Sequence, residues 1–169
     1  MYLLYSLLFM SLPFRAAGSC TWLGITPDTG GHVTVPTGTS MSESAYAGCL
    51  LLRSIFIPKS VTIIRRYAFS GCKFLDEVIF EEDSQLHTIE YGVFYEAIMT
   101  SITIPKTVTR LGGALFGECA FLTTVTFEAG SQLESLGEGA FFLSGLTSIV
   151  IPKSLTTMEH SGGAYGMCQ

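Results

Sequence analysis

Apolar residues recur along the chain in steps of three and then two positions. In the first clear case Leu52 is followed by Ile55 and then by Ile57, which leaves one outward residue between the last two. Such alternation is typical of a half-buried strand, whereas a helix needs apolar residues at steps of three and four. Frequent Gly and β-branched residues also disfavour helices. We therefore predict short strands at 52–57, 75–80, 99–104, 122–127 and 146–151.

A longer repeat lies over this pattern. Ile57-Pro58-Lys59 recurs twice, each time after 47 residues, as Ile104-Pro105-Lys106 and Ile151-Pro152-Lys153. Phe80-Glu81 also recurs after 47 residues, as Phe127-Glu128, so successive strand ends are separated by 23, 24, 23 and 24 residues. Pro suits a strand end because it has no N–H to donate to the ladder. The repeating unit is therefore a pair of coils.

Repeats of this length predict a stack of coils. The stacked strands would align into a parallel sheet, and segments such as Val61-x-x-Ile64 would form a second extended edge. Ala68-Phe69 would then turn the chain with the Phe inside. A degenerate earlier coil is visible at Val33-x-Val35-Pro36, although residues 37–43 are polar. The expected fold is a right-handed, β-rich repeat solenoid with one short parallel strand per coil.

One set of positions in these coils resembles the BspA-type leucine-rich repeat family. The matching residues are Ile57-Pro58, Val61, Ile64, Ala68-Phe69 and Gly71-Cys72, and the resemblance extends over residues 33–168. It implies leucine-rich-repeat coils in a cell-surface or secreted protein of microbes or some protists, often linked to adhesion and to contact with a host or matrix.

The chain divides into three parts. Residues 1–18 are apolar and end in small residues, which is typical of a signal peptide; the alternatives are a hydrophobic cap over the open end of the solenoid and a misplaced start codon. Residues 19–50 are a degenerate N-terminal coil or cap, and 51–169 form a solenoid of about five coils, the last incomplete. No later segment is predicted to span a membrane. No polar cap precedes Gln169, so we expect either a fragment of a longer protein or end-to-end self-association.

Composition excludes some classes of protein. Apolar residues make up 48% of the chain and charged residues 14%, which is too apolar for a disordered chain. The net charge of −5 disfavours nucleic acid as a partner, because no basic surface would neutralise phosphates.

Cysteines occupy one repeated place in the coils. Cys49, Cys72, Cys119 and Cys168 all fall there, and the intervening coils carry Ala or Ser, which indicates a small, buried packing position. Residues two coils apart are about 9.6 Å apart, beyond the roughly 7 Å that a disulfide spans between Cα atoms. We favour free thiols in the core, with a Cys49–Cys72 disulfide between neighbouring coils as the alternative.

Histidine and the remaining polar residues suggest no catalysis. His32, His87 and His160 lie at different places in their coils, and no metal-binding, nucleophile–base or phosphate-loop pattern recurs. We therefore expect a protein that is not an enzyme and needs no cofactor or metal.

The outward strand residues are the candidate binding face, since stacked repeats present an extended surface. We predict a non-catalytic protein-interaction or adhesion module, secreted or at the cell surface, with a protein or glycan partner; it would be cytoplasmic if residues 1–18 are not a signal peptide. The alternatives are that these residues serve sheet formation alone, and that the chain is a structural or truncated fragment without binding activity. The face comprises Ser54, Phe56, Glu77, Ile79, Ser101, Thr103, Thr124, Thr126, Ser148 and Val150.

Overall fold

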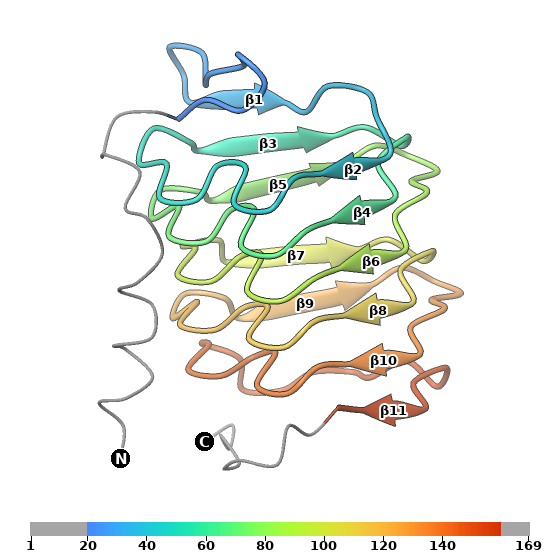
Figure 1. Cartoon of the computed structure of the whole chain (residues 1–169). Coiled ribbons are helices and arrows are strands. Elements are labelled where there is room, and N and C mark those ends of the chain that lie inside the picture. The colour runs from blue at the N-terminus through green and yellow to red at the C-terminus, as the bar shows by residue number, and fades with distance from the viewer. Residues whose placement is uncertain (1–19, 160–169) are drawn as a thin grey trace.

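The chain winds into a stack of coils whose straight segments are all short β-strands (Figure 1). We describe residues 20–159 of a computed structural model, and no helix occurs in this range. The strands of successive coils pair in parallel. The predicted β-rich solenoid with a short parallel strand per coil is therefore confirmed. The predicted signal peptide at 1–18, His160 and Cys168 lie outside the described residues.

One side of the stack carries the longer strands. Four of the five predicted strands form here, each starting two residues later than expected, because the leading apolar residue of each motif turns into the core instead. An earlier strand from the degenerate coil joins them. The strands are β1 (His32–Thr34), β3 (Ser54–Ile57), β5 (Glu77–Phe80), β7 (Ser101–Ile104) and β9 (Thr124–Phe127).

The fifth predicted strand is wrong, because residues 146–151 form no strand and pair with no neighbour. Strand pairing also fails one 47-residue repeat earlier, since β5 and β7 lie in separate sheets. Both failures fall at a step of 24 residues, whereas the 23-residue steps from β3 to β5 and from β7 to β9 each give four paired residues. The extra residue thus coincides with loss of strand pairing.

The other side of the stack is one continuous six-stranded sheet of two-residue strands, which confirms the predicted second edge. The polar segment of the first coil still joins it, because Met41 pairs with Ile64 and is fully buried. The strands are β2 (Ser40–Met41), β4 (Ile63–Ile64), β6 (Thr88–Ile89), β8 (Arg110–Leu111), β10 (Ser135–Leu136) and β11 (Thr157–Met158).

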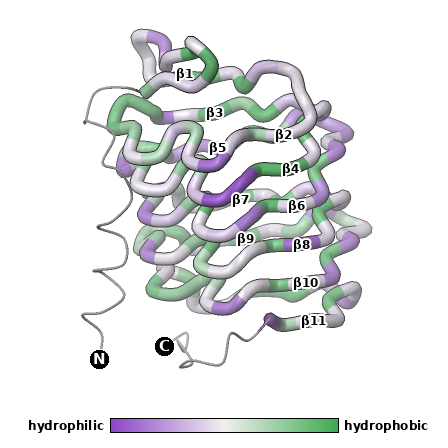
Figure 2. Tube along the Cα trace, viewed as in Figure 1, coloured by the Kyte–Doolittle hydropathy of each residue, from purple (hydrophilic) through white to green (hydrophobic). Residues whose placement is uncertain are grey.

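A column of stacked phenylalanine rings runs through the core where each coil turns. Phe69, Phe94 and Phe116 are fully buried, and Phe141 continues the column half-buried. Neighbouring ring centroids are 5.6–5.7 Å apart with nearly parallel planes. Hydrophobic positions accordingly recur at the same place from coil to coil (Figure 2). The predicted inward Phe of each coil is confirmed.

Two glycines, Gly112 and Gly38, differ in how closely a neighbouring coil packs against them. A Cβ on Gly112 would lie 2.5 Å from main-chain atoms of Glu90 and Tyr91 in the preceding coil, where nothing flexible can give way. Gly38 has open space around the same position. We expect Gly112→Ala to lower the free energy of unfolding by about 1–3 kcal/mol, the usual cost of overpacking, and Gly38→Ala to leave it nearly unchanged. Urea unfolding followed by circular dichroism measures both; equal midpoints would contradict the close stacking.

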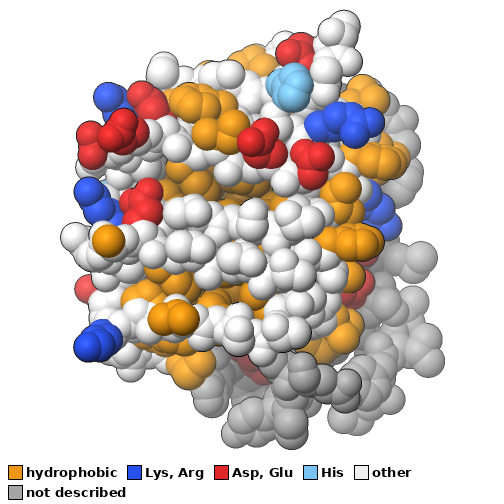
Figure 3. All heavy atoms as spheres, turned by 180° about the vertical axis from the view of Figure 1, so that it is seen from behind, with side chains coloured by type: hydrophobic (Ala, Val, Ile, Leu, Met, Phe, Trp, Pro, Cys, Tyr) orange, Lys and Arg blue, Asp and Glu red, His pale blue; other side chains and the backbone are white. Residues whose placement is uncertain are grey.

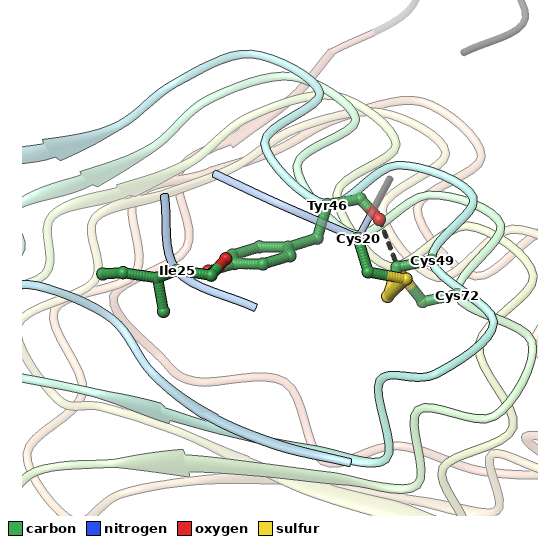
Figure 4. The surroundings of a disulfide bond; sticks show 5 residues. All are labelled: Cys20, Ile25, Tyr46, Cys49 and Cys72. Atoms are coloured by element: carbon green, nitrogen blue, oxygen red, sulfur yellow. Dashed lines mark hydrogen bonds between the residues drawn. A yellow bond between two sulfur atoms is a disulfide. The ribbon is translucent and has the colours of Figure 1, made fainter. Parts of the chain in front are cut away.

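The N-terminal end of the stack is covered by a disulfide-linked cap, residues 20–31 (Figure 4). Cys20 is bonded to Cys49, the ring of Trp22 meets that of Tyr46 edge-on at 6.1 Å, and the Tyr46 hydroxyl donates to the carbonyl of Ile25. The prediction for Cys49, a free thiol or a bond to Cys72, is therefore wrong. Cys20 precedes the first coil and does not occupy the repeated Cys position, so the repeat pattern does not predict that it bonds to Cys49.

Candidate functional site

The predicted binding face lies on the side that carries the longer strands. Pairing places its residues side by side in rows, such as Ser101 beside Thr124 and Thr103 beside Thr126. In the view onto this face, backbone and side chains that are neither apolar nor charged fill the centre, with apolar side chains on either side of them (Figure 3). The exposed members of the predicted set are Glu77, Ile79, Ser101, Thr103, Thr124, Thr126, Ser148 and Val150.

Ser54 and Phe56 depart from the prediction of an exposed face. Ser54 is buried at 8% exposure, and its hydroxyl is hydrogen-bonded to Nδ1 of His32. Phe56 is half-buried between its register partners Thr34 and Ile79. The physical reason is that β1 extends the sheet by one strand, so residues of the first coil shield the β3 row. Among the predicted residues, the exposed ones therefore begin at β5.

A groove opens where this face ends, between β9 and residues 148–154. It has a volume of about 630 Å³, and four of the predicted face residues line it: Thr124, Thr126, Ser148 and Val150. Its apolar lining includes Val125, Phe127 and Ile149. The four residues were predicted from the sequence but the groove was not, because residues 146–151 were expected to form a strand that pairs with β9.

Two glutamates bond to the main chain at the C-terminal ends of the paired strands. The carboxylate of Glu81 accepts the N–H of Lys59 at 2.8 Å, and that of Glu128 accepts the N–H of Lys106 at 2.9 Å. Each Pro-Lys step thus receives its acceptor from the following coil. These contacts occur only at the 23-residue steps within residues 20–159, so they stabilise the same strand pairs that the ladder joins. In the sequence, the two glutamates can be recognised by the recurrence of Phe-Glu after 47 residues.

The two free cysteines of the described chain lie in the core, as predicted for Cys72 and Cys119. The thiol of Cys72 donates to the carbonyl of Tyr46, and that of Cys119 to the carbonyl of Phe94, both at 3.0 Å. Burial raises the pKa of each thiol to about 12. Neither is a nucleophile at neutral pH, since the thiolate is the reactive form.

Residues 20–159 bring together no group of three His, Cys, Asp or Glu side chains that could hold a metal ion. The same range contains no helix of the length and apolarity required to cross a bilayer.

Comparison with known proteins gives a consistent result. The chain matches the BspA type leucine rich repeat region in six copies over residues 39–167. Among solved structures it is similar to the pneumococcal vaccine antigen PcpA, with a TM-score of 0.65 and 26% identity over 76% of this chain and 36% of that one. It therefore spans only about a third of that structure. No curated protein matches the chain.

Two further solved structures share the fold at lower identity. The leucine-rich repeat protein of T. pallidum has a TM-score of 0.52 and 19% identity, over 76% of this chain and 69% of that one. A leucine-rich repeat protein from Bacteroides capillosus has a TM-score of 0.50 and 22% identity, over 60% of this chain and 80% of that one. With the family's repeat covering most of its length, the chain belongs to the BspA-type leucine-rich repeat family.

Proposed function

We propose that this chain is a non-catalytic protein-interaction module, exported from the cell, that binds a partner protein through its longer-strand face. The observation that carries the proposal is the set of exposed rows on β5, β7 and β9, of which the β9 row lines a groove. A surface made mostly of Ser and Thr side chains, with the charged Glu77 and the apolar Ile79 and Val150, offers hydrogen bonds and apolar contacts to a protein.

Two observations support export. The Cys20–Cys49 disulfide is of a kind that persists in oxidising compartments and is rare in reducing ones. The similar protein PcpA is a vaccine antigen of pneumococcus, which is consistent with a surface location for this chain too. N-terminal sequencing of the natural protein tests export: we expect secreted or surface material that has lost its first residues, whereas cytosolic material with intact Met1 would contradict it.

Binding through this face is tested with a pair of double variants. Thr103→Lys with Thr126→Lys places two charges side by side in the middle of the face, while Thr37→Lys with Thr39→Lys places the same charges on the exposed loop between β1 and β2. We expect the first pair to weaken partner binding at least about tenfold and the second to leave it unchanged, because an unmatched charge in an interface is costly.

The measurement is affinity capture from extracellular and cell-surface proteins, quantified by mass spectrometry, with each variant beside the unmodified chain. A protein retained by the unmodified chain and by the loop variant, but lost from the face variant, is the expected partner. If both variants retain the same proteins, the proposed face is wrong.

A further inference from the structure

The longer-strand face is divided into two separate sheets, one of β1, β3 and β5 and one of β7 and β9. β5 and β7 belong to separate sheets, and β9 has a strand partner on one side only, whereas the six-stranded sheet behind them continues without a break. Strand pairing is therefore interrupted on the longer-strand face alone, between β5 and β7 and again after β9; we call these two places the openings. The two openings are 47 residues apart, which is the length of the sequence repeat.

The main chain of β9 shows which groups face its opening. Thr124 and Glu128 donate their N–H groups to the carbonyls of Thr100 and Ile104 in the β7 coil. In a parallel ladder, successive residues direct their N–H and C=O to opposite sides of the strand. The main-chain groups of Val125 and Phe127 consequently face the groove, where residues 146–151 form no strand to receive them.

A free strand edge of this kind is a template for another extended chain. β9 is four residues long, about 13 Å at the usual rise of a strand, and the groove beside it has a volume of about 630 Å³. That volume is within the range of sites that bind small ligands.

Charge restricts the occupant. Of the residues that line the groove, Glu128 and Lys153 alone are charged, they have opposite signs, and both follow the strand positions of their coils. The rest of the lining is hydroxyl-bearing or apolar. A charged side chain inserted against the uncharged remainder of the lining would lose hydration without gaining an opposite charge, and the two charges of the groove offset each other, so an uncharged segment complements it.

We propose that the groove between β9 and residues 148–154 binds an extended, uncharged peptide segment of a partner protein, which adds to β9 as a strand. Alternate apolar side chains of the segment pack against Phe127 and Ile149, and its main chain bonds to Val125 and Phe127. This inference rests on the proposed function and adds to it the conformation and chemistry of what is bound.

The test uses a peptide that already matches a β9 edge. Residues 100–105, Thr-Ser-Ile-Thr-Ile-Pro, form the natural neighbour of β9 on its other side and carry no charged side chain. The probe is this peptide with blocked ends and a fluorescent label, titrated with the full chain and followed by fluorescence anisotropy. The matched control is the same peptide methylated at two alternate backbone nitrogens, which removes donors and keeps the side chains.

We expect the probe to bind with a Kd below about 1 mM, and the methylated peptide at least about tenfold more weakly, because main-chain hydrogen bonds carry the interaction. Ser148→Trp should fill the groove and abolish probe binding. Thr37→Trp, on the exposed loop between β1 and β2 and away from both the face and the groove, should preserve it. Equal binding of both peptides, or no binding of the probe, would overturn the inference.

Amide hydrogen exchange supplies a readout at the residues themselves. Without peptide, the amides of Val125 and Val78, which face the two openings, should exchange faster than those of Ile55 and Ile102, which face paired strands. Addition of the probe should slow exchange at Val125 and Phe127 and leave Ile55 unchanged.

The two proposals fail in different ways. Loss of partner capture by the Thr103→Lys and Thr126→Lys variant, together with unchanged exchange at Val125, would keep the binding face and reject strand addition. Unchanged partner capture by that variant would reject the face itself.

Discussion

Phe94→Ala will lower the free energy of unfolding by about 3–5 kcal/mol, the cost of truncating a large buried aromatic side chain. The ring of Phe94 is fully buried and stacks at 5.6 Å on Phe69 in the preceding coil and on Phe116 in the following one. Its loss therefore removes contacts in both directions along the stack. Because a repeat protein is stabilised by contacts between neighbouring coils, the effect of a central coil should extend to the whole chain.

Phe121→Ala is the matched control, since the chemical change is the same and the side chain is 62% exposed. We expect it to alter the free energy of unfolding by about 0.5 kcal/mol or less. Urea unfolding followed by circular dichroism compares the two variants, and Phe94→Leu should give an intermediate loss because it retains part of the buried volume. If Phe94→Ala and Phe121→Ala unfold at the same urea concentration, the stacked column does not stabilise the fold.

Cys20→Ser will lower the stability by about 3–4 kcal/mol under non-reducing conditions, as estimated from loop closure over a sequence separation of 29 residues. The bond fixes the cap to the first coil, where Trp22 and the carbonyl of Ile25 contact Tyr46 (Figure 4). The cap shields one end of the stack, so its release should start unfolding there. Thermal melting and exchange of the Val33 and Val35 amides measure the change.

A reductant provides the control for this variant. It should lower the melting temperature of the unmodified chain to that of Cys20→Ser, and leave the variant itself unchanged. Alkylation of the denatured, non-reduced protein followed by peptide mapping should find Cys72 and Cys119 modified and Cys20 and Cys49 protected. A melting temperature insensitive to both the reductant and the substitution would show that the disulfide does not hold the cap.

Alternation along a strand predicts the exposure of some residues of the binding face correctly and of others incorrectly. Thr124 and Thr126 were predicted to point outward because they alternate with Val125 and Phe127, and alternation is a local property of an extended chain. Ser54 fits the same alternation and is nevertheless buried, because His32 of the preceding coil lies beside it and is hydrogen-bonded to its hydroxyl. Exposure depends on neighbours that are distant in sequence, so a repeat pattern predicts the direction of a side chain better than its accessibility.

The sequence by itself determined that this chain is a solenoid, which strand residues face inward, and that Phe and a small residue (Cys, Ala or Ser) recur at fixed places in the coils. It could do so because every coil meets the same constraint, namely a buried apolar row at a fixed position. Only the tertiary structure decided that Cys20 bonds to Cys49, that pairing fails at the 24-residue steps, and that a groove opens beside β9. The 24-residue steps are visible in the sequence, but their effect on strand pairing is not, and the segment that folds back over the first coil lies outside the repeat. Both features depend on packing between coils, which a periodic pattern does not record.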